Sequence, residues 1–324
     1  MTTPQKTFRF SLLMLLLLVP LFQGKAGAKL RVVATTEHEA LIAREIGGDL
    51  VDVQWIAGAD QDPLAMEPDS NFVPFLEKAD LLLVNGEELE AGWLGTLLKE
   101  VKNRKMNPKG SDRVVLSEGV RLLPFSDDDF LGSRFQEILA SQGIRRRVAN
   151  HHYWLDPENS IPMIRNIAAA FARADGKNAA AYERTADERI ARLKEKIREW
   201  DEKMVPFRGK KVILYHRNWN YLVLRHGLEI AAIIEPKEMN RPADTVFRDL
   251  AVRFKDQAIS LVLLSGSERP PFVDIDRVRD LAVRIHARSV ILPESMKMSD
   301  RLGDLDSYFD YVYKVLIAYL SNTP

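Results

Sequence analysis

A stretch without glycine or proline, Ala179–Met204, constrains the fold of this chain more than any other feature. Its apolar side chains recur at three- and four-residue spacing: Ile190, Leu193, Ile197, Trp200 and Met204. This spacing predicts one long amphipathic helix, which Pro206 and Gly209 then end. About 25 residues at about 1.5 Å each give a rod of roughly 37 Å, long enough to run from one lobe to another. A packed helix within a single domain has the same periodicity, so the pattern alone leaves both arrangements open.

Short apolar runs alternate with amphipathic segments on both sides of this helix. The predicted strands are Leu30–Ala34, Val51–Ile56, Leu81–Val84 and Arg113–Leu116 before it, and Lys211–Tyr215, Glu229–Ile234, Leu261–Leu264 and Ser289–Leu292 after it. The predicted helices between them are Glu39–Ile46, Phe72–Lys78, Tyr221–His226, Thr245–Asp256 and Asp274–Arg284. Continuous apolar runs separated by helices are typical of parallel strands covered on both faces. The sequence therefore predicts two α/β units, one before the long helix and one after it.

The amino terminus has the three parts of a secretory signal. Lys6 and Arg9 precede an apolar run, Leu12–Phe22, and Ala26-Gly27-Ala28 supplies the small residues of a cleavage site. A membrane anchor is the alternative, but eleven apolar residues are too few to span a bilayer. We therefore expect residues 1–28 to be removed and the product to be soluble and periplasmic.

The composition excludes several classes of function. The 46 Lys and Arg residues balance the 46 Asp and Glu residues, whereas a dedicated nucleic-acid-binding protein needs a basic excess. The chain has no cysteine, which excludes disulfides, cysteine zinc sites, thiol catalysis and a lipid anchor on cysteine. It has no G-x-S-x-G, GxGxxG, P-loop or HExxH motif, so no enzyme class is indicated. Any metal would have to be bound by His, Asp or Glu.

Two histidine positions stand out among the six in the chain. His151 and His152 lie together within Asn150–Pro157, just before an amphipathic helix predicted to start near Glu158. His216 directly follows a predicted strand, Lys211–Tyr215. Ligands of open α/β sheets bind beyond the carboxyl ends of the strands, and neutral imidazole is a common ligand for zinc and related ions. Packing or hydrogen bonding remains the alternative role for each histidine, because spacing alone does not separate the two.

Several short motifs, taken in order along the chain, resemble one known family. They are Val32-Val33-Ala34-Thr35-Thr36, Gln61-Asp62-Pro63 with Glu67-Pro68, Val84-Asn85-Gly86, Asn150-x-His152-x-Trp154-Leu155-Asp156-Pro157, Tyr215-His216, Arg225-x-Gly227-Leu228 and Glu235-Pro236-Lys237. Together they resemble the cluster A-I periplasmic zinc/manganese solute-binding proteins of ABC importers, the ZnuA/TroA type. The resemblance spans essentially the whole mature chain.

The resemblance implies an α/β fold with two lobes, each with a parallel sheet, joined by one long rigid helix, with the ligand cleft between the lobes. On this chain it implies a cleaved signal peptide at 1–28, an N-terminal lobe at 29–175, the linker helix at 176–205 and a C-terminal lobe at 206–324. The implied function is not enzymatic: a monomeric periplasmic component binds a divalent metal, zinc or manganese, without an organic cofactor. It then delivers the metal to the membrane permease of the transporter.

The resemblance also implies a metal site, and two of its ligands match without substitution. His152 and His216 stand at two of the family's histidine positions, whereas His151 stands where the family usually has proline. Glu294 follows Pro293 near the position of the family's last carboxylate.

The first family histidine is missing from this chain. It belongs to an Asp-Pro-His motif, but the sequence here reads Asp62-Pro63-Leu64, and leucine cannot bind a metal. Glu67 and His38 are candidates to replace it, and we expect the ligand set to be His152, His216, Glu294 and Glu67. Two other functions stay open: a divergent paralogue whose degraded site binds another small ligand or serves the transporter as an accessory, and a metal-dependent hydrolase, which no motif supports.

Overall fold

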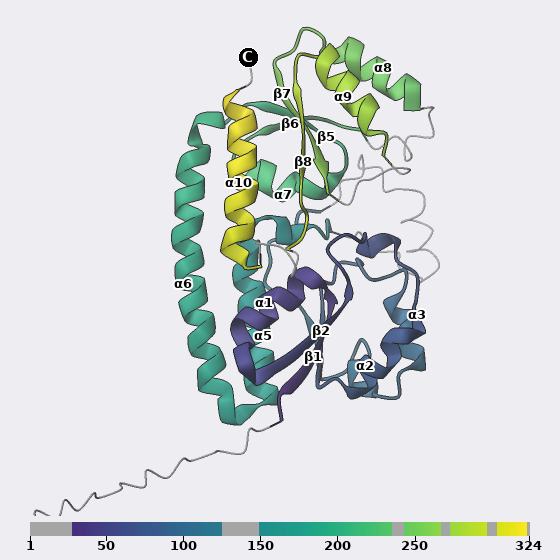
Figure 1. Ribbon diagram of the computed structural model, residues 1–324, viewed down its shortest axis with the longest axis vertical. Helices are drawn as coiled ribbons and strands as arrows, with labels where there is room; N and C mark the ends of the chain where they lie inside the picture. The colour runs from purple at the N-terminus through teal and green to yellow at the C-terminus, as the bar shows by residue number, and fades with distance from the viewer. Residues whose placement is uncertain (1–27, 125–148, 235–242, 267–272, 297–302, 323–324) are drawn as a thin grey trace, which may run out of the picture.

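The computed structural model describes residues 28–124, 149–234, 243–266, 273–296 and 303–322. These residues form two α/β lobes stacked along the long axis of the molecule, with one long helix running beside both of them (Figure 1). The part of the predicted resemblance at Glu235-Pro236-Lys237 and the predicted signal up to residue 27 lie outside the described residues.

The two lobes are built on the same strand order. The N-terminal sheet contains β1 (Leu30–Thr36), β2 (Val51–Ala57), β3 (Leu81–Val84) and β4 (Arg113–Val115), all parallel, in the order β2-β1-β3-β4. The C-terminal sheet contains β5 (Lys211–Leu214), β6 (Glu229–Ile233), β7 (Ile259–Ser265) and β8 (Arg288–Leu292), in the order β6-β5-β7-β8. All eight predicted strands are confirmed, with ends shifted by at most two residues.

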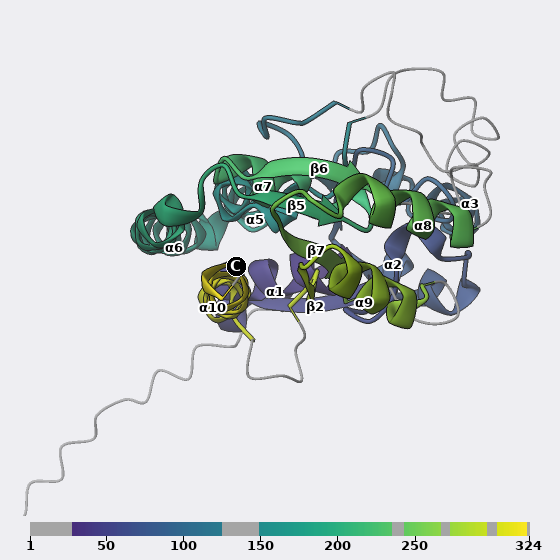
Figure 2. The same cartoon turned by 90° about the horizontal axis from the view of Figure 1, so that it is seen from above.

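Helices cover both faces of each sheet. The N-terminal lobe has α1 (Glu37–Gly47), α2 (Val73–Lys78), α3 (Leu94–Glu100) and α5 (Ser160–Ala174), and the C-terminal lobe has α7 (Asn220–Arg225), α8 (Ala243–Phe254), α9 (Ile275–Arg284) and α10 (Leu305–Ser321). Seen from above, α10 and the long helix α6 lie on one side of the C-terminal sheet and α8 and α9 on the other (Figure 2). Helices α3 and α10 are absent from the sequence prediction above.

Alternating side chains on the strands divide the interior into three cores. On β1, Val32 and Ala34 face a central core that is shared by both lobes, whereas Val33 faces the side covered by α2 and α3. On β5, Val212 faces the same central core and Ile213 faces the side covered by α8 and α9. Because successive side chains of a strand point to opposite faces, fully apolar strands are what a sheet covered on both faces requires.

The long helix α6 (Ala179–Met204) has the predicted bounds. Its buried stripe consists of Tyr182, Ala186, Ile190, Leu193, Ile197, Trp200 and Met204. The helix also joins the lobes through Arg189, whose guanidinium donates to Glu45 on α1 at 2.6 Å and to Asp306 on α10 at 2.7 Å. Among the described helices, none is both long and apolar enough to cross a membrane.

Candidate metal site

The segment that carries His152 lies between the lobes and is held by buried aromatic side chains. It forms two short 3-10 turns, Tyr153–Leu155 and Pro157–Asn159. The Tyr153 hydroxyl donates to the Asn85 carbonyl at the end of β3 (2.8 Å), which fixes the segment to the N-terminal lobe. The Trp154 indole N–H donates to the carbonyl oxygen of Glu294 (2.8 Å), which fixes it to the C-terminal lobe. The segment is therefore a bridge rather than a free loop.

His152 itself is partly exposed and packed among rings. Its imidazole lies 4.5 Å from the ring of His151 and 5.2 Å from the ring of Trp154, measured between centroids. Burial lowers the pKa of His152 well below its usual range, and charges on His151 and His216 would lower the pKa further. An imidazole that resists protonation in this way is neutral at pH 7, the form that coordinates a metal.

His216 follows β5, as the sequence predicts. The loop that carries it is joined to the His152 segment by Asn150, whose side chain donates to the carbonyl of Arg217 at 2.8 Å and accepts the backbone N–H of His152 at 2.9 Å. The His216 ring packs edge-on against Tyr215, with centroids 4.9 Å apart.

Glu294 is held on the same side as His216 by a neighbouring amide. The Asn218 side chain is 8% exposed and donates to the carboxylate of Glu294 and to the hydroxyl of Ser265, the latter at 3.0 Å. Asn218 lies two residues after His216, so one loop supplies a predicted ligand and the group that orients another. Neither asparagine nor serine at these positions is singled out in the sequence analysis.

The remaining candidates are in different surroundings. Glu67 is exposed, on the segment between β2 and α2, and the described residues give it no hydrogen bond or ion pair. His38 is 2% exposed, with neither ring nitrogen hydrogen-bonded to a described residue, and its ring packs edge-on against Tyr308 at 5.7 Å. Burial lowers the pKa of His38 to about 3. His38 is therefore a neutral core side chain.

Leu64 occupies the family's first histidine position and is packed rather than exposed. The turn is retained: the Asp62 carboxylate accepts from the Leu64 backbone N–H at 2.9 Å, and the Pro63 carbonyl accepts from the Trp93 indole N–H at 2.8 Å. The Leu64 side chain packs against the central core. At this position the chain thus has an apolar contact and no metal-binding side chain.

A buried acidic pair lies at the carboxyl ends of β1 and β3. The Thr35 hydroxyl is 2.9 Å from an oxygen of Glu39 and 2.7 Å from an oxygen of Glu90. A hydroxyl has one proton to donate, so one of these contacts requires a protonated carboxyl. Glu90 accepts the backbone N–H of Asn85 at 2.7 Å and that of Gly86 at 3.3 Å, which favours its charged form.

Glu39 accepts only one backbone N–H, that of Thr36 at 3.1 Å, against the two accepted by Glu90, so Glu39 carries the proton. Its buried site, together with the charge of Glu90, raises the pKa of Glu39 well above its usual range. In this arrangement Glu39 donates to Thr35, which donates to Glu90. The pair thus fills the end of the N-terminal sheet with a hydrogen-bonded network, although one oxygen of Glu39 has no partner among the described residues.

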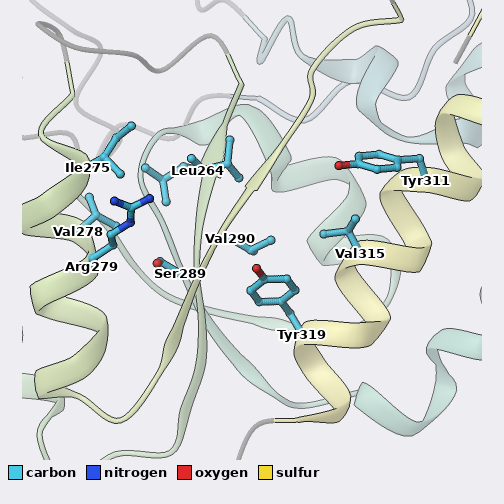
Figure 3. A pocket seen from close by; sticks show the side chains of 10 residues that line it. Leu264, Ile275, Val278, Arg279, Ser289, Val290, Tyr311, Val315 and Tyr319 are labelled. Atoms are coloured by element: carbon cyan, nitrogen blue, oxygen red, sulfur yellow. The ribbon is translucent and has the colours of Figure 1, made fainter. Parts of the chain in front are cut away.

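Across the described ranges, no three His, Asp or Glu side chains form a group that could hold a metal. The structure joins the loops that carry His152 and His216 and fastens Glu294 beside Asn218, but it does not gather three or more of the predicted ligands into one group. A separate pocket of about 330 Å³ lies between α9 and α10 across β8 (Figure 3). Its lining includes Ile275, Val290, Tyr311 and Tyr319 but no His, Asp or Glu, so it is not a metal site.

A family model described as the periplasmic zinc-uptake complex component A, ZnuA, matches residues 32–315. The chain belongs to this family. The manganese ABC transporter substrate-binding lipoprotein PsaA of Streptococcus mitis is 27% identical and covers 92% of both chains. The metal ABC transporter substrate-binding lipoprotein SsaB of Streptococcus sanguinis is 26% identical over 86% of this chain and 84% of its own.

Solved structures confirm the fold of this ZnuA-family chain. A crystal structure of ZnuA matches it with a TM-score of 0.72 at 20% identity, over 90% of this chain and 99% of the other. The manganese-bound periplasmic metal-binding protein from Candidatus Liberibacter asiaticus has a TM-score of 0.68 at 18% identity, over 89% and 98%. The two parallel-sheet lobes and the long helix are thus those expected from the sequence motifs.

Proposed function

We propose that this protein is the periplasmic substrate-binding component of an ABC importer that captures a divalent transition metal, zinc or manganese, between its lobes. It delivers the metal to a membrane permease and is not an enzyme. The observation that carries the proposal is that one side chain, Asn150, hydrogen-bonds both to the backbone of His152 on the segment that bridges the lobes and to the carbonyl of Arg217, the residue after His216. Family membership and the names of the relatives, which are transport proteins for manganese or other metals, support it.

The chemistry of the donors fits such a cargo. Zinc takes His nitrogen and carboxylate oxygen at about 2.0–2.2 Å, usually with about four ligands. In this proposal the His152 and His216 imidazoles and the Glu294 carboxylate come together around the ion as three donors, and Glu67 or solvent is the fourth. Imidazole suits zinc, while a larger carboxylate share favours manganese, so the same site accommodates either ion.

The location and assembly follow from the sequence. The proposal includes a cleaved signal at residues 1–28, lobes at 29–175 and 206–324, and a linker helix at 176–205. The relatives are named as lipoproteins, but this chain has no cysteine to carry the lipid. We therefore infer a soluble, monomeric periplasmic protein without a lipid anchor.

The test is calorimetric titration of the exported, metal-stripped protein with zinc and with manganese. His152→Ala and His216→Ala should each weaken binding of the preferred metal at least about tenfold, which is about 1.4 kcal/mol. Glu294→Ala and Glu67→Ala test the carboxylates. His286→Asn is the matched control, because His286 is exposed at the end of α9 in a left-handed conformation (φ 55°) that asparagine tolerates.

The second candidate is a divergent paralogue with a degraded site, and Leu64 favours it. A leucine packed into the core where the family has a ligand leaves the first lobe short of a donor. If neither metal binds to the parent protein, this paralogue replaces the importer component as the function. If the metals bind but His152→Ala and His216→Ala bind like the parent, the site assignment is wrong while the function stands.

A further inference from the structure

The side chain of Asn150 joins the two loops that carry the predicted histidine ligands. Asn150 is 2% exposed. Its amide nitrogen donates to the carbonyl oxygen of Arg217 at 2.8 Å, and Arg217 is the residue directly after His216. Its amide oxygen accepts the backbone N–H of His152 at 2.9 Å and lies 3.1 Å from Nδ1 of the His152 ring. One amide therefore touches both loops.

These partners determine which way the amide faces. A backbone carbonyl can only accept, so the Asn150 atom beside Arg217 must be the NH₂ group. A backbone N–H can only donate, so the atom beside the His152 backbone must be the oxygen. The orientation of the amide, which geometry alone often leaves ambiguous, is fixed here by two independent contacts.

The orientation in turn determines the tautomer of His152. The amide oxygen only accepts, so the hydrogen bond at 3.1 Å requires a proton on Nδ1. A neutral imidazole has one N–H, so Nε2 of His152 is left with its lone pair free to coordinate. Metal-bound histidines commonly donate their other ring N–H to an oxygen in this way, and losing that partner typically costs about 10- to 100-fold in affinity.

We propose that Asn150 is a positioning residue: it selects the Nδ1–H tautomer of His152 and registers the His152 loop against the His216 loop. The inference rests on the proposed metal-binding function. One amide thus sets both the ring orientation of His152 and the alignment of the two loops. Asn150 does not touch the metal itself.

Tyr221 supplies a matched control for this role. Its hydroxyl donates to the backbone carbonyl of Asn150 at 2.6 Å and accepts the backbone N–H of Leu123 at 2.9 Å. Tyr221 belongs to α7, so it also joins the bridging segment to the C-terminal lobe. Tyr221→Phe removes this bond between the lobes without altering the Asn150 amide.

The first measurement needs no metal. The tautomer of His152 is read from the ring nitrogen shifts of the metal-stripped, ¹⁵N-labelled protein by NMR. The parent and Tyr221→Phe should show a proton on Nδ1. Asn150→Ala should lose this preference, whereas Asn150→Asp retains an acceptor oxygen and should keep it.

The second measurement is zinc affinity by titration of the same proteins. Asn150→Ala should bind about 10- to 100-fold more weakly, Tyr221→Phe within about threefold of the parent, and Asn150→Asp between them, because it keeps the acceptor but loses the donor to Arg217. If Asn150→Ala does not fold, Asn150→Asp and Tyr221→Phe still test the two roles of Asn150. These roles are selecting the His152 tautomer and aligning the two loops. An unchanged tautomer and affinity in Asn150→Ala would overturn the proposal. A parent that binds no metal refutes the proposed function, while the tautomer of Asn150→Ala still decides the positioning role.

Discussion

The two lobes share one strand order but differ in what lies at the carboxyl ends of their strands. In the N-terminal lobe, Thr35, Glu39 and Glu90 form a buried hydrogen-bonded network, and Leu64 packs against the central core at the position of the family's first histidine. In the C-terminal lobe, the same edge presents His216 and Glu294, both partly exposed. Repeated topology thus gives one closed edge and one open edge. The topology of a sheet therefore fixes where a binding site can form, and a few side chains determine whether a site forms there.

The largest expected effect concerns the fastening between the lobes. Arg225 on α7 donates to both oxygens of Asp201 on α6, at 3.0 and 2.7 Å, and also pairs with Asp156 and Glu158 on the bridging segment. Arg225→Met leaves the buried Asp156 without its cation, so the free energy of unfolding should fall by about 3–5 kcal/mol. Urea denaturation measures the change. Arg225→Lys keeps the positive charge but not the bidentate geometry of the guanidinium, so it should lose less stability than Arg225→Met. Equal losses of stability in the two variants would show that the charge plays no part.

The next effect tests the closed edge. Glu90 accepts two backbone N–H groups and faces the partly buried Arg113, so Glu90→Gln should destabilise the protein by about 2–3 kcal/mol. Glu39 already carries a proton, so Glu39→Gln removes no charge and should cost only about 1 kcal/mol. Thermal or urea unfolding of the two variants at pH 7 measures the asymmetry. The reverse order would place the proton on Glu90 instead.

A smaller effect separates the buried histidine of the first lobe from the ligands. His38→Leu removes two ring nitrogens that lack partners among the described residues, so stability at pH 7 should rise by about 1–2 kcal/mol. The folded pKa of His38 is about 3, below the unfolded value of about 6.5. The unfolded chain therefore binds the extra proton, and the parent loses stability as pH falls below about 6.5.

The pH dependence of the difference is the measurement. The gap between His38→Leu and the parent should widen by about 1.7 kcal/mol in total from pH 6.5 to pH 5, with a slope that approaches about 1.4 kcal/mol for each pH unit well below pH 6.5. Taking the difference cancels the carboxyl groups that titrate in both proteins. A constant gap would mean that His38 is hydrated or paired, and zinc affinity below that of the parent would return His38 to the ligand set.

The smallest expected effect comes from adding a possible metal ligand to the N-terminal lobe. Leu64→His restores the family's Asp-Pro-His sequence in a turn whose backbone hydrogen bonds are intact. We expect zinc affinity to tighten a few-fold, about 1 kcal/mol, with some loss of stability because Leu64 packs against the central core. Leu64→Asn, a polar side chain of similar size, is the control for packing. Affinity that does not change in Leu64→His would indicate that Glu67 or solvent already completes the coordination.

The sequence predicts the fold because the fold depends on local patterns. Strands such as Leu81–Val84 are continuous apolar runs, and α6 has its stripe without interruption. Helix α10 has an equally regular spacing of buried apolar residues, so the sequence contains a pattern that predicts this helix as well. These residues are Leu305, Tyr308, Phe309, Val312, Leu316 and Leu320.

The site is less predictable because its contacts join distant parts of the chain. His216 could be found from its place after a strand, but the amide of Asn150 reaches Arg217 across 67 positions. Asn218 and Glu294 are 76 positions apart. The first pair depends on how the loop after β5 docks against the His152 segment, and the second on how β5 and β8 are placed in one sheet. No local pattern encodes either arrangement. The sequence shows that Leu64 cannot bind a metal, but only the packing shows that the vacancy is filled by core contacts.

The central core has a consequence for how the molecule comes apart. It contains side chains from β1 and β3 of one lobe, from β5 and β7 of the other, and from α6 along both. Neither lobe can lose its structure without exposing apolar surface that belongs to the other. Heating should therefore produce a single cooperative transition, with calorimetric and van't Hoff enthalpies in agreement, and the slowest amide protons of both sheets should exchange together. The two lobes therefore behave as one cooperative unit, and capture or release of a metal depends on side chains and short segments between the lobes.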